Sequence, residues 1–220
     1  MAAAQQIPLD LPFRPALGRG DFYVSAPNEA AVAWVDRWPR WPAPALILQG
    51  PPASGKTHLA AVWAARTRAR ALKPHGHDHG LILEPVLVDG LDPWVGDREA
   101  EVALFHLHNA AAEAGQSLLI TMRMTPAEAD FALPDLASRL RAAPVAAIAP
   151  PDDALLAAVL CKLFADRQIG IGQEAVAYLL PRMERSFAAA REIVARADAL
   201  ALAKGGGVTV PLLRRVLAEG

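Results

Sequence analysis

The chain contains 220 residues with a formal net charge of −1, and 53% of its residues are hydrophobic while 20% are charged. This length suits one α/β domain with a small additional domain, the composition excludes wholesale disorder, and the charge excludes a globally basic nucleic-acid binder. The single Cys161 excludes an internal disulfide framework, and neither a signal peptide nor an apolar run of about 18 residues is present, so we expect a cytoplasmic protein without a membrane partner.

Residues 1–20 are predicted to form an extended arm, because prolines and glycines recur through them. The arm contains the hexapeptide Gln6-Ile7-Pro8-Leu9-Asp10-Leu11. An extended peptide has little helix to unfold on binding, Gln6 offers amide hydrogen bonds, and Leu9 and Leu11 can fill an apolar pocket of a partner. Alternatively, these apolar side chains pack on the chain's own domain.

Residues 21–150 alternate between patterns typical of strands and patterns typical of helices. We expect helices over 28–38, with Asn28 as the cap, 56–70 and 97–114. We expect strands over 45–48, 81–83, 86–88 and 117–121. This alternation predicts an α/β domain in which helices cover both faces of a parallel sheet.

A phosphate-binding loop of the form G-x-x-x-x-G-K-T lies between an expected strand and an expected helix. Its residues are Gly50, Pro51, Pro52, Ala53, Ser54, Gly55, Lys56 and Thr57. The glycines permit a turn that aims backbone N–H groups at a phosphate. Lys56 brings a positive charge to the β- and γ-phosphates, and the Thr57 hydroxyl can join a Mg²⁺ shell. The alternative is a chance glycine-rich turn.

Asp89 follows the expected strand 86–88, where a nucleotide site of this kind needs an acid. We expect it to hold Mg²⁺ through water beside Thr57, although an acid at a turn after a strand is the alternative. Many hydrolases carry a second acid next to this one. Here that position is Gly90 and the nearest acid is Asp92, so we expect weak or no intrinsic ATP hydrolysis.

Residues 151–220 are predicted to form a small all-α lid domain. Asp152 can cap a helix whose apolar residues recur at i, i+3 and i+4 spacing. Further helices are expected over 173–181, 184–203 and 210–218.

In this order, the motifs resemble the AAA+ module of bacterial DnaA-type proteins. The residues that carry the resemblance are Asp21-Phe22-Tyr23-Val24, Asn28, Gly50 to His58, Asp89 and Leu133-Pro134-Asp135-Leu136-Ala137-Ser138-Arg139-Leu140. The last octapeptide, the Phe105-x-Leu107-x-Asn109 segment and the short chain are most similar to the Hda type of DnaA-related regulator.

The resemblance implies roles for particular residues. The adenine pocket would be lined by Phe22, Tyr23, Val24 and Asn28, and the loop through His58 would hold ADP or ATP. Arg185 would touch this nucleotide in cis. Arg139 would serve as an arginine finger in trans. Thr121 matches the start of the first sensor, but Met122-Arg123-Met124 departs from the polar residues usual there. By spacing alone, Arg139, Arg141 and Arg185 could equally be solvated surface residues.

The implied function is regulation of replication initiation. The hexapeptide, through Gln6, Ile7, Leu9 and Leu11, resembles peptides that dock on the DNA polymerase III sliding clamp, its β subunit. The other implied partner is DnaA, whose bound ATP would be hydrolysed to give inactive DnaA–ADP. No helix-turn-helix reader follows the expected lid, so DNA would be reached only through the clamp, and a homo-oligomer is allowed.

Two other functions remain open at this point: an autonomous AAA+ ATPase of helicase-loader type, and a small P-loop kinase, for which no acceptor site is identified. His75-Gly76-His77-Asp78-His79 is either a metal ligand cluster or a solvated loop.

Overall fold

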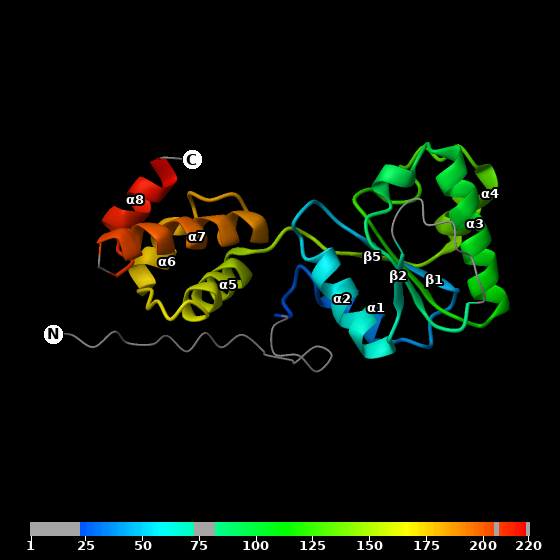
Figure 1. The fold of residues 1–220 in the computed structure, drawn as a ribbon, viewed down its shortest axis with the longest axis horizontal. Helices are drawn as coiled ribbons and strands as arrows, with labels where there is room; N and C mark the ends of the chain where they lie inside the picture. The colour runs from blue at the N-terminus through cyan, green and yellow to red at the C-terminus, as the bar shows by residue number, and fades with distance from the viewer. Residues whose placement is uncertain (1–22, 73–81, 205–206, 219–220) are drawn as a thin grey trace. The chain divides into compact units, whose positions relative to one another are not determined.

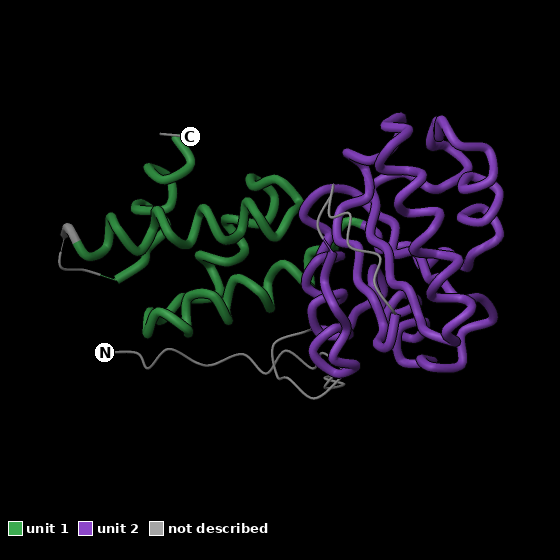
Figure 2. The backbone as a smooth tube through the Cα atoms, turned by 45° about the vertical axis from the view of Figure 1, so that its right-hand side comes forward, with its two compact units in different colours: residues 1–13, 150–220 green, residues 14–149 purple. Residues whose placement is uncertain are grey.

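The computed structural model describes residues 23–72, 82–204 and 207–218 (Figure 1). The described residues up to Ala149 belong to one compact unit, and those from Pro150 onward belong to another (Figure 2). Each unit has its own apolar core. Among the described residues, no helix has the length and apolar character needed to cross a membrane.

A five-stranded parallel sheet organises the first unit, so the predicted α/β fold class is confirmed. In sequence order the strands are β1 (Ala45–Gln49), β2 (Arg70–Leu72), β3 (Val86–Val88), β4 (Leu118–Met122) and β5 (Val145–Ala147). Their order across the sheet is β2-β3-β4-β1-β5. Because all strands are parallel, the loops that follow β1, β3 and β4 gather at one edge of the sheet.

Helices cover both faces of this sheet, as the alternation predicted (Figure 1). The helices of this unit are α1 (Glu29–Asp36), α2 (Lys56–Thr67), α3 (Arg98–Glu113) and α4 (Pro134–Ala142), with a 3-10 turn η2 (Asp92–Trp94). Leu46 and Leu48 face the core that α1 and α2 share. Ala45 and Ile47 face the core of α3 and α4, because successive strand residues point to opposite faces.

Several boundaries differ from the sequence predictions. The helix expected over 56–70 ends at Thr67, because Arg68 adopts a left-handed φ of 57° and the chain then pairs with β3 as β2. The strand expected over 81–83 is wrong at Ile82 and Leu83, which lie in no strand, while Leu81 is outside the described residues.

Asn28 is the N-cap residue of α1, as predicted, but its side chain makes no capping hydrogen bond, and the helix ends at Asp36. Its Oδ1 accepts from the Ser25 backbone N–H at 2.9 Å, and its Nδ2 donates to the Tyr23 carbonyl at 2.8 Å. The Asn28 side chain therefore fixes the turn before the helix. In contrast, the helix expected over 97–114 begins at Arg98, and Asp97 caps it by accepting from the N–H groups of Glu99 and Ala100.

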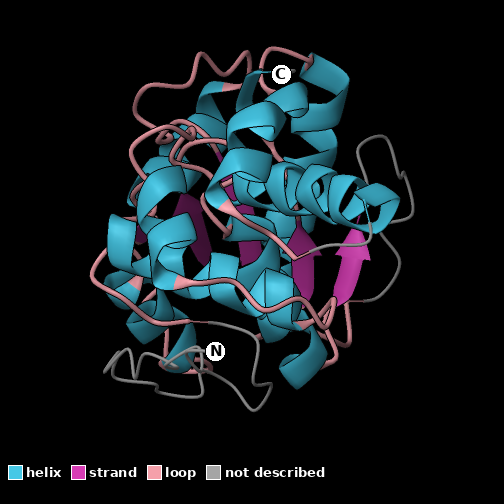
Figure 3. Cartoon of the chain, turned by 90° about the vertical axis from the view of Figure 1, so that its left-hand side faces the viewer, coloured by secondary structure: helices cyan, strands magenta, loops and turns pink. Residues whose placement is uncertain are grey.

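In the described part of the second unit, the regular secondary structure consists of helices (Figure 3). Its helices are α5 (Asp153–Ala165), α6 (Gln173–Leu179), α7 (Phe187–Lys204) and α8 (Val210–Ala218), close to the four predicted segments. Asp152 caps α5 as predicted, with its carboxylate 2.8 Å from the Leu155 nitrogen. The main departure is the start of α7, where Ser186 accepts from the Ala189 N–H and delays the helix to Phe187.

Candidate functional site

The loop between β1 and α2 packs closely against the chain that leaves β5. A Cβ atom added to Gly50 would lie 2.4 Å from the carbonyl oxygen of Ile148, far inside van der Waals contact. Gly55 ends the loop at a φ of 100°, where other residues are strained. Each glycine of the motif thus meets a steric demand of the fold.

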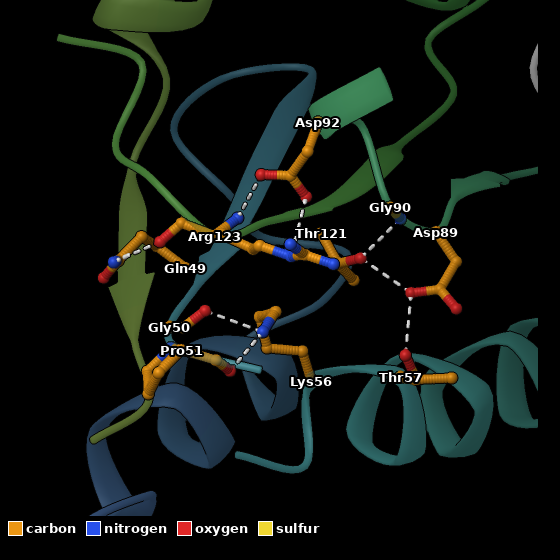
Figure 4. Close-up of polar contacts among 10 residues, drawn as sticks. All are labelled: Gln49, Gly50, Pro51, Lys56, Thr57, Asp89, Gly90, Asp92, Thr121 and Arg123. Atoms are coloured by element: carbon orange, nitrogen blue, oxygen red, sulfur yellow. Dashed lines mark hydrogen bonds and ion pairs between the residues drawn. The ribbon is translucent and has the colours of Figure 1, made fainter. Parts of the chain in front are cut away.

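Lys56 is the first residue of α2 and turns back over the loop (Figure 4). Its Nζ donates to the carbonyl oxygens of Gly50 and Pro51, at 2.7 Å each. Burial lowers the pKa of Lys56, opposed by the charges of Asp92 and Asp89 and assisted by Arg123. The ammonium is therefore held at the mouth of the loop by acceptors that phosphate oxygens can replace.

Asp89 and Thr57 lie next to each other, as the sequence led us to expect. The Thr57 hydroxyl donates to Asp89 Oδ1 at 3.2 Å, and the Thr121 hydroxyl donates to the same oxygen at 2.6 Å. Thr121 Oγ1 in turn accepts from the Gly90 N–H at 2.8 Å. A hydroxyl and a carboxylate are oxygen ligands of the type that Mg²⁺ takes. Within the described ranges, no three His, Cys, Asp or Glu side chains gather into a group that could hold a metal ion.

Asp92 in η2 and Arg123, which directly follows β4, extend the site (Figure 4). The Arg123 N–H donates to Asp92 Oδ1 at 2.8 Å, and Arg123 Nε lies 4.0 Å from Asp92 Oδ2. Gln49 holds the Arg123 carbonyl at 2.7 Å. The Arg123 side chain is 65% exposed. The sequence marked Arg123 only as a departure from the sensor pattern, and it gave no signal that Asp92 would be its partner.

The segment expected to line the adenine pocket is hydrogen-bonded to the chain after β5, which also contacts the phosphate-binding loop. The Ala149 N–H donates to the Pro27 carbonyl at 2.9 Å, one residue after the Ile148 that touches Gly50. Asn28 is only 3% exposed, and both polar ends of its side chain are used within the turn. Any nucleotide contact at Asn28 would therefore have to replace those bonds, and the adenine pocket stays a prediction.

Arg139 lies on the exposed face of α4, where its guanidinium carbon is 4.9 Å from the centre of the Phe105 ring on α3. Burial lowers the pKa of the neighbouring His108, and the positive charge of Arg139 lowers it further. Arg141 instead donates from Nε to the Pro126 carbonyl at 3.3 Å. Of these two arginines, Arg139 is the one whose head group lies on an aromatic face.

Arg185 belongs to the helical unit, where its Nη2 lies 3.0 Å from Asp153 Oδ1 at the start of α5. Both side chains are more than half exposed, so the pair is easily broken. Its expected contact with a nucleotide stays a prediction.

Other predicted site residues can be placed only in part. Val24 is half-buried against the α1–α2 core, Ser54 is buried, and His58 is exposed in the first turn of α2. The following lie outside the described residues: Gln6, Ile7, Leu9, Leu11, Phe22 and the 75–79 histidine cluster.

No family model matches the chain. Among solved structures, domain III of the replication initiation protein DnaA from Thermotoga maritima matches with a TM-score of 0.78 and 18% identity, over 94% of this chain and 98% of that one. AMPPCP-bound DnaA from Aquifex aeolicus matches with a TM-score of 0.68 and 17% identity, over 87% of this chain and 67% of that one. The RuvB Holliday junction branch migration motor of Thermotoga maritima matches with a TM-score of 0.66 and 14% identity, over 87% of this chain and 66% of that one. The chain therefore has the AAA+ fold seen in DnaA domain III.

Proposed function

We propose that this protein binds an adenine nucleotide, ADP or ATP, and stimulates hydrolysis of the ATP held by DnaA. DnaA would then pass to its inactive ADP form and replication initiation would be limited. The observation that carries the proposal is an exposed Arg139, stacked on Phe105, on a DnaA-like fold that has its own phosphate-binding loop.

In the protein's own site, the backbone of the loop and Lys56 hold the phosphates. Lys56 exchanges the carbonyl oxygens of Gly50 and Pro51 for charged phosphate oxygens, which are stronger acceptors. Thr57 and Asp89 are the residues that would hold Mg²⁺, which neutralises phosphate charge when bound. The structurally similar DnaA from Aquifex aeolicus is seen with AMPPCP bound, which supports nucleotide binding by this fold.

The chemistry is proposed to occur on the partner's nucleotide. Arg139 would reach the γ-phosphate of ATP bound by DnaA and stabilise the charge that develops as the phosphoryl group leaves. Arginine fingers in other nucleotide hydrolases raise the rate by roughly 10³–10⁵. Arg185 would contact the protein's own nucleotide after leaving Asp153.

Two partners follow from this proposal. The arm would dock on the β sliding clamp of DNA polymerase III, and DnaA would meet the face of α4 that carries Arg139. DNA would be reached only through the clamp, and the proposed site of action is the cytoplasm.

An autonomous ATPase of helicase-loader type is the competing function. Gly90 argues against it, because it supplies no acid to orient water and its N–H is bound to Thr121. Steady-state hydrolysis by the purified protein alone discriminates between the two: sustained turnover without DnaA would favour the autonomous enzyme.

The direct test measures hydrolysis of labelled ATP on DnaA, with and without DNA-loaded clamp. We expect the protein to accelerate hydrolysis only when loaded clamp is present. No acceleration with all components present would refute the proposed function.

The arm gives a separate prediction. Replacing Gln6, Leu9 and Leu11 together by alanine is expected to abolish clamp binding without changing the melting temperature, because the peptide would contact only the partner. Surface plasmon resonance on immobilised clamp and a thermal melt check this. A variant that still binds would move the contact elsewhere, and one that melts earlier would show that these side chains pack on the protein itself.

Arg123 gives a prediction about nucleotide preference. Its exposed guanidinium lies close enough to Lys56 to lower the pKa of that lysine, so it can add a second positive charge to the terminal phosphate. Arg123→Ala is expected to weaken ATP binding about tenfold, about 1.4 kcal/mol, while ADP binding changes less than about twofold. Titration with fluorescent nucleotides measures both affinities. Arg66→Ala, at the far end of α2, is the matched control, and equal losses for ATP and ADP would contradict the prediction.

A further inference from the structure

Glu101 is a fully buried carboxylate that the nucleotide site does not use. It lies in the first turn of α3 and is 0% exposed. The buried polar side chains of the described residues are Asn28, Ser54, Glu101, His108, Thr121 and Ser186, so Glu101 is the one carboxylate among them. Burying a carboxylate is costly unless strong hydrogen bonds replace its water, so its bonds indicate what it is there to hold.

Three backbone N–H groups meet the Glu101 carboxylate. Oε1 accepts from Gly96 at 2.7 Å and from Ala132 at 3.1 Å, and Oε2 accepts from Leu133 at 2.6 Å. Gly96 precedes α3, whereas Ala132 and Leu133 lead into α4. The carboxylate therefore joins the start of α3 to the start of α4, through partners that lie 31 and 32 residues after Glu101.

Leu133 is the N-cap residue of α4 and has no side-chain oxygen with which to cap it. Pro134 follows and has no N–H of its own. The entry of the chain into α4 is therefore fixed by a side chain of α3. A negative charge is also favoured at the positive ends of both helices.

The same two helices meet again at Arg139. Phe105 lies one turn after Glu101 on α3, and Arg139 lies six residues after Leu133 on α4, about 9 Å along the helix. The Arg139 guanidinium stacks on Phe105 at 4.9 Å. With the apolar side of α4 packed on α3 through Leu136 and Leu140, Glu101 sets where α4 begins and hence where Arg139 is presented.

We propose that Glu101 is a positioning residue for Arg139, which rests on the proposed role of Arg139 as an arginine finger. A group that stabilises a transition state must be placed closely, since a misplacement of about 1 Å costs roughly 10²-fold in rate. Two hydrogen bonds to this buried carboxylate, from Ala132 and Leu133, hold the start of α4, and the third, from Gly96, ties the carboxylate to the segment before α3. Loss of one bond leaves α4 folded on its apolar contacts but shifts or loosens its exposed face.

Glu101→Gln tests this, because the amide keeps the shape of the side chain while one of its two terminal atoms becomes a donor facing an N–H donor. We expect the maximal stimulation of DnaA-bound ATP hydrolysis to fall about tenfold or more, with ADP affinity within about twofold of the wild type. Combined with Arg139→Ala, the substitution should add no further loss, because both act through one group. Hydrogen exchange should quicken over 132–142 and stay unchanged over 45–67.

Glu128→Gln is the matched control, since the Glu128 carboxylate also accepts a backbone N–H, from Thr125, but is exposed and does not reach α4. It should keep full stimulation. If Glu101→Gln does not fold, Glu101→Asp keeps the charge but is one methylene shorter, and it should show the same loss. Suppose that Arg139→Ala loses stimulation. Full stimulation by a folded Glu101 variant, or further loss in the double variant, would then overturn the positioning role. If Arg139→Ala retains stimulation, the proposed function at Arg139 fails first, and the positioning role with it.

Discussion

Replacing Arg139 with alanine is expected to remove the stimulation of DnaA-bound ATP hydrolysis while leaving the protein folded. The side chain is exposed, and its guanidinium lies over the Phe105 ring, a contact worth about 0.5–1 kcal/mol of stability at an exposed site. In contrast, an arginine placed against a transferring phosphoryl group is worth roughly 10³–10⁵ in rate. A loss of tenfold or more corresponds to about 1.4 kcal/mol or more of transition-state stabilisation.

The measurement is hydrolysis of DnaA-bound ATP with loaded clamp, beside ADP titration, clamp binding and a thermal melt of the variant. ADP and clamp binding should be unchanged. Arg141→Ala is the matched control, because Arg141 lies on the same helix but donates to the Pro126 carbonyl. If the Arg139 variant keeps full stimulation and the Arg141 variant loses it, Arg141 rather than Arg139 would be the arginine finger.

Replacing Lys56 with alanine is expected to remove the stabilisation that ADP confers. A ligand at about a hundredfold excess over its dissociation constant adds about 2.7 kcal/mol to the free energy of unfolding, so the wild type should melt several degrees higher with ADP. Without Lys56 the β-phosphate loses its charged partner, whereas the apo protein changes little. Burial already lowers the pKa of this lysine, which means that its charge is partly desolvated before ligand arrives.

Differential scanning fluorimetry with and without ADP measures this shift. Lys162→Ala, in the helical unit, should melt close to the wild type and keep the ADP shift, because the Lys162–Asp166 pair is a surface i,i+4 contact. A Lys56 variant that is stabilised by ADP as strongly as the wild type would remove the loop from the nucleotide site.

The parts of the fold that the sequence predicted best depend on neighbouring residues. The helices α5 and α8 follow an apolar pattern repeated within a few residues, and Asp97 and Asp152 cap helices that begin directly after them. Such signals are local, because a helix forms its hydrogen bonds within one segment.

The edge strand β2 was not predictable in the same way. Its sequence, Arg-Ala-Leu, continues the composition of the helix before it and becomes a strand only by pairing with β3. Asn28 likewise matched a helix cap, but its side chain bonds backward to Ser25 and Tyr23. A short strand is stabilised by the strand beside it, and a side-chain amide bonds to whichever groups the turn presents. Local sequence propensity therefore predicts neither the strand β2 nor the hydrogen bonds of Asn28.

The sequence by itself determined the phosphate-binding loop and the acid that faces it. The spacing of Gly50, Gly55, Lys56 and Thr57 is a local steric pattern, and an acid after a buried parallel strand must emerge at the same edge of the sheet. Only the tertiary structure decided that Asp92 pairs with Arg123 and that Glu101 holds the start of α4. Both contacts join residues about 30 positions apart, and such contacts form only after the parallel sheet and its covering helices have brought their elements together.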